Sequence, residues 1–190
     1  MQNPFKEKMI EKKEQADVKP RKLELLSDLE HVEIKKLGQE EVKPIYLVMK
    51  KTLWEVGEAQ VADVVKSGLS YGAYVERMPV GAGLAWPAFY DEARQSVGEG
   101  EPNAIYLEDV ALLLAYEGKG IRDMLVAERE KAAKAKGFAY AIAFISPDWK
   151  PGDLREMIRE RGNKAERAYL AMGYSFVRGR DGILAVKKLG

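Results

Sequence analysis

Two closely spaced glycines, Gly118 and Gly120, stand between an apolar run and a charged run with helical periodicity. A helix that begins just after small residues presents unpaired backbone N–H groups and the positive end of its dipole. This combination binds phosphate or pyrophosphate, because no side chain holds the anion away from the backbone. An ordinary turn from a strand into a helix fits the same residues, so both interpretations stand. The sequence contains neither GxxxxGKS nor GxxxxGKT, which argues against a P-loop kinase or ATPase.

Several kinds of site are excluded by the residues that the sequence lacks. It has no cysteine and a single histidine, His31. Disulfides, thiolate metal sites and a cysteine nucleophile are therefore excluded, and no metal site is expected. A Ser-His-Asp triad would have to use His31, which we interpret as an exposed residue without a role.

The composition predicts a globular protein with one core. Hydrophobic residues make up 46% of the 190 positions and charged residues 32%. Lys and Arg number 31 against 30 Asp and Glu, so no excess of positive charge indicates a nucleic-acid partner. The N-terminus is too charged for a signal peptide and no apolar run reaches bilayer length, so we expect a cytoplasmic protein without a membrane partner. The scarcity of Asn and Gln resembles thermophile usage.

The chain divides into a charged helical extension at residues 1–28 and a folded domain at residues 29–190. The extension is interpreted either as a solvated arm or as a dimerisation arm of a homodimer. Strands are expected at residues 31–37, 71–77, 80–86, 104–114, 140–145, 174–178 and 183–188. Helices are expected at residues 41–55, 58–66, 121–136 and 154–172.

Particular residues set the limits of these elements. Pro44 is expected to interrupt the first helix early, and Pro87 to end the third strand and open a polar loop. Gly162 breaks the last helix, and Asn163 with Glu166 restarts it through a capping box. Hairpins alternate with two right-handed crossovers in this order of elements. The predicted class is therefore α/β or α+β, with a single mixed, mostly antiparallel sheet flanked by helices.

Two segments carry a resemblance to a known family. YLEDVALLLAYEGKGIRDMLV (residues 106–126) resembles the acetyl-CoA loop of the GNAT superfamily of N-acetyltransferases, and NKAERAYLAMGY (residues 163–174) resembles its later helix. The order of elements from residue 31 onward agrees with it, and small-amine, spermidine-type members are the most similar in their motifs. The family's Arg or Gln, Gly, and Gly or Ala fall here on Glu117, Gly120 and Arg122. Its Asn falls on Gly162.

The resemblance implies direct transfer of an acetyl group from acetyl-CoA, the co-substrate, to a primary amine. Tyr169 occupies the place of the general acid, and Glu108 that of a base acting through water. From periodicity alone, Tyr169 is equally a core tyrosine and Glu108 a surface carboxylate on a strand. Asp109 would face the opposite side of the sheet from Glu108, so at most one of the two lines the site.

The resemblance also implies binding residues. Backbone at Leu112, Leu113 and Leu114 would pair with the pantetheine arm. The pyrophosphate loop would comprise Glu117, Gly118, Lys119, Gly120, Ile121 and Arg122. Trp54, Glu55, Trp86 and Tyr90 would line the acceptor cleft, where acidic and aromatic groups suit a cationic amine, although solvated loops fit the same composition. The expected partner is a small-molecule or peptidic amine, and residues 146–154 with Trp149 would form a lid.

Two alternatives to an acetyltransferase stay open at this point. Because Glu117 and Arg122 depart from the family's loop, the chain could be a GNAT fold that has become a non-catalytic binding or assembly module. It could also transfer a different acyl group from its CoA thioester, since fold resemblance does not fix the acyl group.

Overall fold

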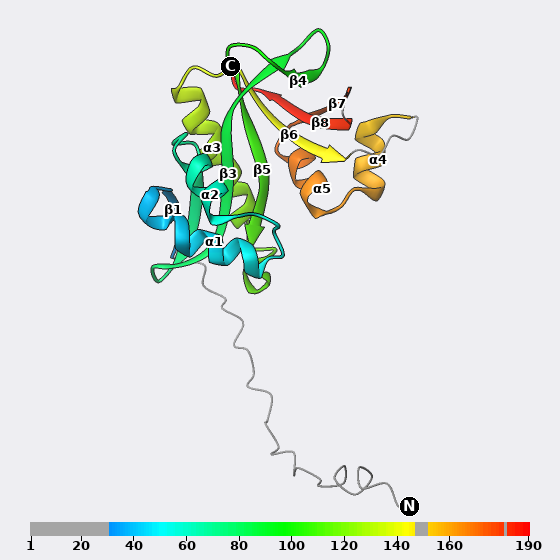
Figure 1. Cartoon of the computed structure of the whole chain (residues 1–190). Helices are drawn as coiled ribbons and strands as arrows, with labels where there is room; N and C mark the ends of the chain where they lie inside the picture. Colours follow the sequence, from blue (N-terminus) through cyan, green and yellow to red (C-terminus); the bar gives the residue numbers. More distant parts are fainter. Residues whose placement is uncertain (1–30, 147–151, 181) are drawn as a thin grey trace, which may run out of the picture. The chain divides into compact units, whose positions relative to one another are not determined.

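The computed structural model describes residues 31–146, 152–180 and 182–190 (Figure 1). The expected N-terminal extension and the expected lid residue Trp149 lie outside these ranges. In chain order the strands and helices are β1 (Val32–Lys36), α1 (Val42–Lys51), α2 (Glu58–Val65), β2 (Tyr71–Val75), β3 (Met78–Asp91), β4 (Ser96–Gly98), β5 (Ala104–Leu112), α3 (Ile121–Ala135), β6 (Tyr140–Ser146), α4 (Leu154–Arg161), α5 (Lys164–Ala171), β7 (Ser175–Gly179) and β8 (Gly182–Lys188). Short 3₁₀ helices cover Gln39–Glu41 and Leu114–Tyr116.

The eight strands of the described chain form one sheet in the order β1-β2-β3-β5-β6-β8-β7, with β4 paired to the far end of β3. Only β5 and β6 run parallel, and every other neighbouring pair is antiparallel. The predicted fold class, a mixed and mostly antiparallel sheet flanked by helices, is thereby confirmed. The parallel pair requires a crossover, which α3 supplies.

Helices cover both faces of this sheet (Figure 1). On one face, α1 and α2 bury Ile45 and Val61 against Leu84 of β3. On the other face, Leu125 of α3 packs in one cluster with Val110 of β5. The same side of the sheet carries α5, whose Tyr169 belongs to a cluster that includes strands β5 and β6. The site described below lies between these layers.

Two expectations about prolines are wrong. Strand β3 continues through Pro87 to Asp91 and returns as β4, so much of the expected polar loop is a hairpin. Pro87 is tolerated because β2 pairs with β3 only as far as Gly83, which leaves one edge of β3 without a hydrogen-bonding neighbour at that point. Pro44 does not interrupt α1, since it lies in the first turn, where its missing N–H would have had no helical partner.

The expected end of the first helix also needs correction, and α3 buries an unexpected residue. Helix α1 stops at Lys51 rather than near residue 55, because Leu53 takes a left-handed φ of 64° and the Trp54 N–H closes onto the Met49 carbonyl at 3.0 Å. In α3, the charged Arg129 is completely buried, whereas the apolar Met124 is 41% exposed.

Other local expectations are confirmed. Helix α4 ends before Gly162, and α5 begins with Asn163 and Glu166 bonded to each other in a capping box. Strands β7 and β8 form the expected hairpin. Among the described residues, no helix is long and apolar enough to cross a membrane.

Candidate active site

The sheet opens between its two parallel strands. Residues 104–106 of β5 pair with residues 140–142 of β6, and beyond them the two strands are no longer partners. Strand β5 stays with β3 as far as Leu112, while β6 stays with β8 as far as Ser146. The divergence is visible in Figure 1, where β6 turns away from β5 towards α4 and α5. The result is a strand edge on β5 whose backbone groups are available to another partner.

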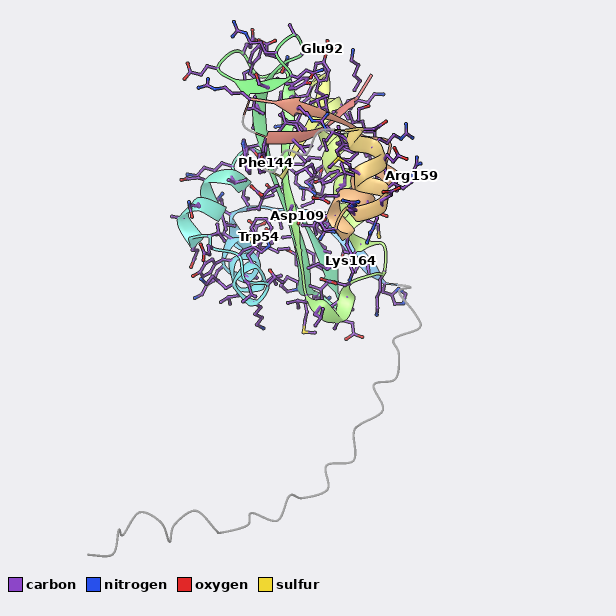
Figure 2. All side chains as sticks on the ribbon, turned by 90° about the vertical axis from the view of Figure 1, so that its right-hand side faces the viewer. Trp54, Glu92, Asp109, Phe144, Arg159 and Lys164 are labelled. Atoms are coloured by element: carbon purple, nitrogen blue, oxygen red, sulfur yellow. The ribbon has the colours of Figure 1, made fainter. Side chains whose placement is uncertain are left out.

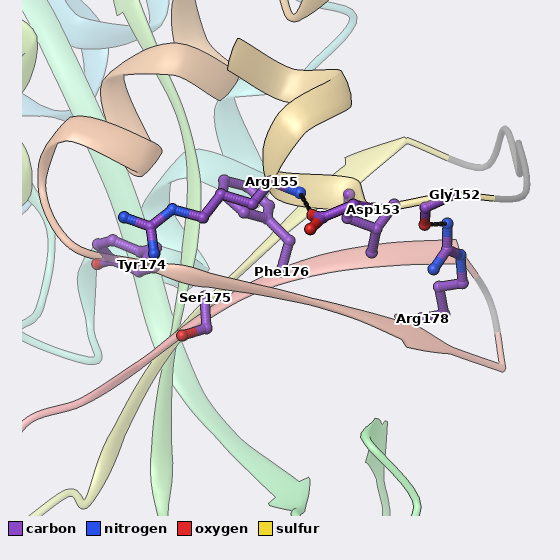
Figure 3. Close-up of a pocket in the computed structure, with 8 residues that line it drawn as sticks. Gly152, Asp153, Arg155, Tyr174, Ser175, Phe176 and Arg178 are labelled. Carbon is purple, nitrogen blue, oxygen red and sulfur yellow. Dashed lines mark hydrogen bonds between the residues drawn. The ribbon is translucent and has the colours of Figure 1, made fainter.

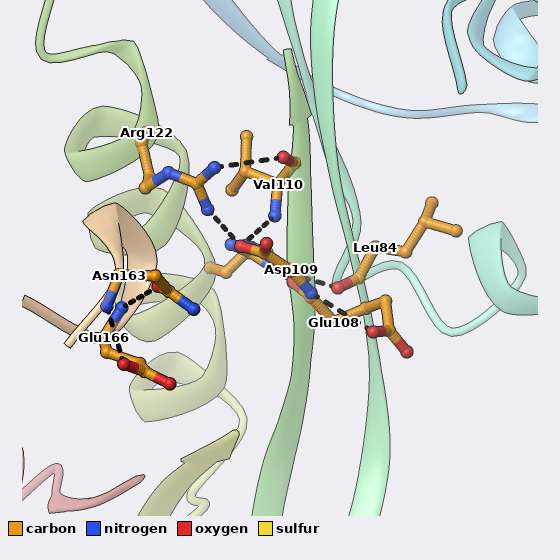
Figure 4. A network of polar contacts seen from close by, with 8 residues as sticks. Leu84, Glu108, Asp109, Val110, Arg122, Asn163 and Glu166 are labelled. Carbon is orange, nitrogen blue, oxygen red and sulfur yellow. Dashed lines mark hydrogen bonds and ion pairs between the residues drawn. The ribbon is translucent and has the colours of Figure 1, made fainter. Parts of the chain in front are cut away.

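A β-bulge lies at the point where β5 leaves β6. One residue of β3, Leu84, stands opposite two residues of β5, Glu108 and Asp109. Figure 4 shows that the Asp109 side chain points to the α3 side of the sheet and the Glu108 side chain points away from it, as alternation along a strand predicts. The prediction that these two carboxylates face opposite sides therefore agrees with the structure.

A buried arginine fixes this bulge. Arg129 of α3 donates from Nη1 to the carbonyls of Leu84 at 2.9 Å and Glu108 at 2.8 Å, and from Nε to the carbonyl of Leu125 at 3.0 Å. Gly83 makes room for it, because a Cβ at that position would lie 2.6 Å from the guanidinium carbon. We did not predict this residue, since a charged side chain on a helix usually indicates the solvent face.

The proposed acid, Tyr169, lies over the opening. It is 3% exposed and packs in one cluster with Leu107 of β5 and Ala143 of β6. Burial raises the pKa of Tyr169, the charge of Arg129 lowers it, and Asp109 raises it again. Leu107 directly precedes Glu108, so the cluster that contains Tyr169 borders the place where Glu108 and Asp109 leave the sheet. The structure thus places Tyr169 and Glu108 around the same bulge.

The Glu108 carboxyl is half-buried, and burial raises its pKa above the ordinary value of 4.5. Its own neighbours act in both directions: the backbone N–H of Asp109 donates to it at 3.3 Å and lowers the pKa, while the Asp109 charge raises it. A carboxyl with a raised pKa is a stronger base than a surface glutamate. This is the property that proton removal from an ammonium group requires.

The loop before α3 has the backbone conformation of an anion site. Gly118 and Gly120 have φ values of 74° and 76°, and Gly120 is the N-cap of α3 without a side-chain cap. Such left-handed positions favour glycine. A hollow of about 360 Å³ opens in front of the helix N-terminus and is lined by Leu112, Glu117, Gly118, Gly120, Ile121, Arg122, Asp123 and Lys164. Backbone at this loop therefore fits the pyrophosphate of a nucleotide-like ligand.

Three charged side chains in this hollow, Glu117, Lys164 and Arg122, are paired within the chain. Glu117 accepts from Lys164 of α5 at 3.1 Å, which offsets the negative charge that departs from the family's loop. Arg122 forms an ion pair with Asp109 and donates to the Val110 carbonyl at 3.4 Å (Figure 4). Arg122 is therefore turned towards the open edge of β5 rather than towards the loop.

The expected pantetheine segment lies along that open edge. Leu113 donates to the Val80 carbonyl of β3 at 2.9 Å. Because backbone groups alternate in direction along an antiparallel strand, those of Val110 and Leu112 point away from β3, towards the opening. Leu114 is in the 3₁₀ helix after the strand and is 83% exposed. Leu112 thus has the orientation that pairing with an extended ligand requires.

The expected acceptor residues are not all brought together. Trp86 stacks on Tyr106 with ring centroids 4.7 Å apart, on the same face of the sheet as Glu108. Trp54 packs against the α1–α2 cluster, next to the exposed Glu55. Tyr90 is 4% exposed and packs edge-on against Tyr140 at 5.2 Å, so its side chain is closed to an acceptor.

Another hollow, of about 380 Å³, lies between the start of α4 and β7 (Figure 3). Asp153 caps α4 by accepting from the Arg155 N–H at 2.8 Å, and Arg178 donates to the Gly152 carbonyl at 2.6 Å. Neither Tyr169 nor Glu108 lines this hollow, so it is separate from the opening between β5 and β6.

Comparisons with solved structures agree with this architecture. The chain is similar to the GphF GNAT-like decarboxylase in complex with isobutyryl-CoA, with a TM-score of 0.64 and 14% identity over 83% of this chain and 100% of that one. The loading GNATL domain of CurA from Lyngbya majuscula gives a TM-score of 0.63 and 15% identity over 84% and 98%. The GNAT family N-acetyltransferase YhbS from Escherichia coli, in complex with CoA, gives a TM-score of 0.59 and 15% identity over 84% of this chain and 82% of that one.

The chain has the GNAT fold. No protein-family model and no curated protein sequence matches it. At 14–15% identity the similarity establishes the GNAT fold and no more, so the likeness to spermidine-type members stays a prediction. Among the described residues, no group of three or more His, Asp or Glu side chains is arranged to hold a metal ion.

Sequence reasoning missed two residues of the site. For Arg129, only the spacing in the sequence indicates burial: it follows Ile121 and Leu125 at intervals of four on α3 and so lies on their buried face. Tyr106 precedes Glu108 by two residues on β5, and that spacing alone would have placed both side chains on one face.

Proposed function

We propose that this chain is an acyltransferase that moves an acetyl group from acetyl-CoA directly to a primary amine. One observation carries the proposal: the opening between β5 and β6 has Glu108 at its bulge, Tyr169 in the cluster that joins β5 and β6, and a glycine-built helix N-terminus after the end of β5. A thioester with a phosphate-bearing tail matches this arrangement of a proton donor, a base and an anion site.

Each group has a role that its surroundings support. Gly118, Gly120 and the first turn of α3 would hold the pyrophosphate through backbone N–H groups. The outward-facing backbone of Leu112 would pair with the pantetheine arm. Acetyl-CoA supplies the thioester carbonyl that the amine attacks. No cysteine exists to carry the acetyl group, so the transfer has no Cys acyl-enzyme stage.

Proton movements fall to two side chains. Glu108 accepts a proton from the ammonium group of the acceptor, directly or through a water molecule, since burial has raised its pKa. Tyr169 donates its hydroxyl proton to the departing sulfur. Arg129 lowers the pKa of that phenol, which makes it a better donor than burial alone would leave it.

The proposal is tested by ligand binding and then by turnover. Acetyl-CoA at 100 times its Kd should raise the Tm of the full chain by about 5 to 10 °C, because a ligand bound only to the folded state stabilises it. Mass spectrometry of an amine mixture should then show products heavier by one acetyl group. ATP is the control for phosphate binding without pantetheine, and isobutyryl-CoA tests the acyl group. No shift with acetyl-CoA at millimolar concentration would refute the proposal.

A second candidate, a non-catalytic binding module, is favoured by one specific observation. Arg122 occupies the Val110 carbonyl on the edge where the pantetheine would pair, and Asp123 adds a negative charge to the first turn of α3. A chain that ignores every acyl-CoA but is recovered with a defined protein partner would support this alternative. Acetyl transfer would exclude it.

A further inference from the structure

An aromatic wall stands next to Glu108 on its own face of the sheet. Tyr106 and Glu108 are two residues apart on β5 and therefore share a face. Trp86 of β3 lies directly opposite Tyr106 in register and stacks on it at an interplanar angle of 19°. Burial raises the pKa of Tyr106 to about 12, and the charge of Glu108 on the same face also raises it.

A small hollow opens at this wall. Its volume is about 150 Å³, and it is lined by Ser96, Val97, Tyr106, Phe144, Gly179, Arg180, Gly182 and Leu184. Phe144 lies where β6 still pairs with β8 but no longer with β5, and it is 42% exposed although it is a large apolar side chain (Figure 2). An apolar cavity of roughly this volume is large enough to hold a benzene ring. We call this hollow the aromatic slot.

Two hairpins close the aromatic slot on its outer side. The tip of the β3–β4 hairpin touches the end of β7, since a Cβ on Gly179 would lie 2.4 Å from the Gln95 carbonyl oxygen. Gly179 must therefore remain glycine for the two hairpins to meet. Val97 of β4 faces the aromatic slot from one hairpin and Leu184 of β8 from the other. The shape is thus set by backbone packing rather than by a loose loop.

The charges around the aromatic slot limit what it can bind. Among the described residues that line it, Arg180 is a cation and none is a carboxylate. A second ammonium group, as in a polyamine, would lie next to the like charge of Arg180 and would find no acidic partner among these described residues. A neutral ring gains from burial there and from edge or stacking contact with Tyr106 and Phe144. One end of the wall therefore suits an ammonium group, at Glu108, and the other suits a ring.

We propose that the acceptor is an arylalkylamine, with its amine at Glu108 and its phenyl-sized ring in the aromatic slot. This inference rests on the proposed function for the reaction, but ring binding is a separate property of the chain. It narrows the acceptor from any primary amine to a monoamine with an apolar ring. A polyamine such as spermidine is a poor acceptor by the same geometry.

Calorimetry tests this inference without turnover. Phenethylamine, n-butylamine and spermidine are titrated into the full chain, alone and with CoA, which cannot donate an acetyl group. Phenethylamine should bind about tenfold more tightly than n-butylamine, since differences of this size follow from filling or leaving an apolar pocket. Where acetyl-CoA turns over, kcat/KM should follow the same order.

Two variants locate the binding. Val97→Phe fills the aromatic slot from the edge strand β4 and should remove the preference for phenethylamine while leaving n-butylamine binding unchanged. Val32→Phe, on the remote edge strand β1, is the matched control and should keep the preference. Phe144→Ala removes one wall from an exposed position and should weaken phenethylamine binding about tenfold even where Val97→Phe does not fold.

Each outcome decides between the two proposals. Equal affinities for phenethylamine and n-butylamine, or a folded Val97→Phe that keeps the preference, would overturn the aromatic slot. Such a result would leave the acetyl-CoA shift in Tm untouched. Failure of acetyl-CoA to bind would refute the acyltransferase, while phenethylamine titrated alone would still support or overturn the aromatic slot.

Discussion

The guanidinium of Arg129 donates to the backbone carbonyl of Glu108 at 2.8 Å from a completely buried position. The same nitrogen bonds the carbonyl of Leu84, so one side chain fastens β3 and β5 together at the bulge. At this bulge Glu108 and Asp109 leave the sheet on opposite faces. Arg129 is therefore a positioning residue for Glu108, and it also acts on the pKa of Tyr169.

The space for Arg129 gives the first prediction. Gly83→Ala should lower the free energy of unfolding by about 1–3 kcal/mol, because the new methyl group would lie 2.6 Å from the guanidinium carbon in a packed core. Urea denaturation monitored by circular dichroism measures this. Gly98→Ala is the control, since it is also a strand glycine and its Cβ would meet nothing closer than 3.8 Å. Equal stabilities of the two variants would show that Arg129 does not fill the site.

Local sequence signals predicted most of the architecture. The double glycine before α3, the Asn163–Glu166 capping box and the strand-like run of β5 each act within a few residues, and all three agree with the structure. The fold class followed from the order of such elements. Pro87 misled because its effect depends on whether β3 has a neighbour at that point, which only the tertiary pairing decides.

The site was harder to predict for a related reason. That Tyr169 and Glu108 lie around one bulge depends on a register shift between β3 and β5, and no residue in the sequence marks that shift. Arg129 is buried because backbone carbonyls freed by the bulge accept its hydrogen bonds. Its charge alone predicts an exposed position instead. The aromatic slot needs β4, β6 and the β7–β8 turn together, and it was beyond a linear pattern.

Neighbouring tyrosines provide the second prediction. Tyr169→Phe should lower kcat about 100-fold with little change in acetyl-CoA affinity, because it removes the proposed proton donor and keeps the ring. Tyr174→Phe should instead lower the stability of the chain and leave kcat nearly unchanged. Its hydroxyl bonds Glu130 at 2.6 Å, so losing it should cost about 1–3 kcal/mol of stability. Steady-state kinetics and urea denaturation of both variants distinguish a proton donor from a stabilising residue. Unchanged kcat in Tyr169→Phe would contradict the role of Tyr169 as the proton donor.

The raised pKa of Glu108 gives the third prediction. In the folded chain this carboxyl holds its proton more tightly than at the ordinary value of 4.5, so its contribution favours folding at low pH. The free energy of unfolding should therefore lose this contribution as the pH rises from 4.5 through the folded pKa. Glu108→Gln should remove this pH dependence. The difference in the free energy of unfolding between the variant and the parent chain should therefore change steadily as the pH rises from 4.5 through the folded pKa of Glu108. Denaturation at a series of pH values measures this difference.

The pH dependence of activity should give a second, independent measure of the raised pKa of Glu108. The acid limb of kcat/KM should lie above pH 4.5 in the parent chain, since Glu108 must lose its proton to act as a base. Glu108→Gln should lower kcat/KM and flatten that limb. Asp109→Asn serves as the comparison: Asp109 faces α3 and pairs with Arg122, so this variant should keep the limb but move it to lower pH, because the Asp109 charge raises the pKa of Glu108. An identical limb in Glu108→Gln would exclude Glu108 as the base.

The two ends of α3 give the last prediction. Gly120 at its start and Gly137 beyond its end have φ values of 76° and 83°, and a Cβ at either position would meet nothing within 4 Å. Alanine at each should therefore cost a similar amount of stability, about 1 kcal/mol, from the left-handed backbone alone. Only Gly120 lines the hollow at the helix N-terminus, so only Gly120→Ala should also weaken acetyl-CoA binding, by at least about tenfold. Calorimetric titration of both variants makes the comparison, and equal affinities would place the pyrophosphate elsewhere.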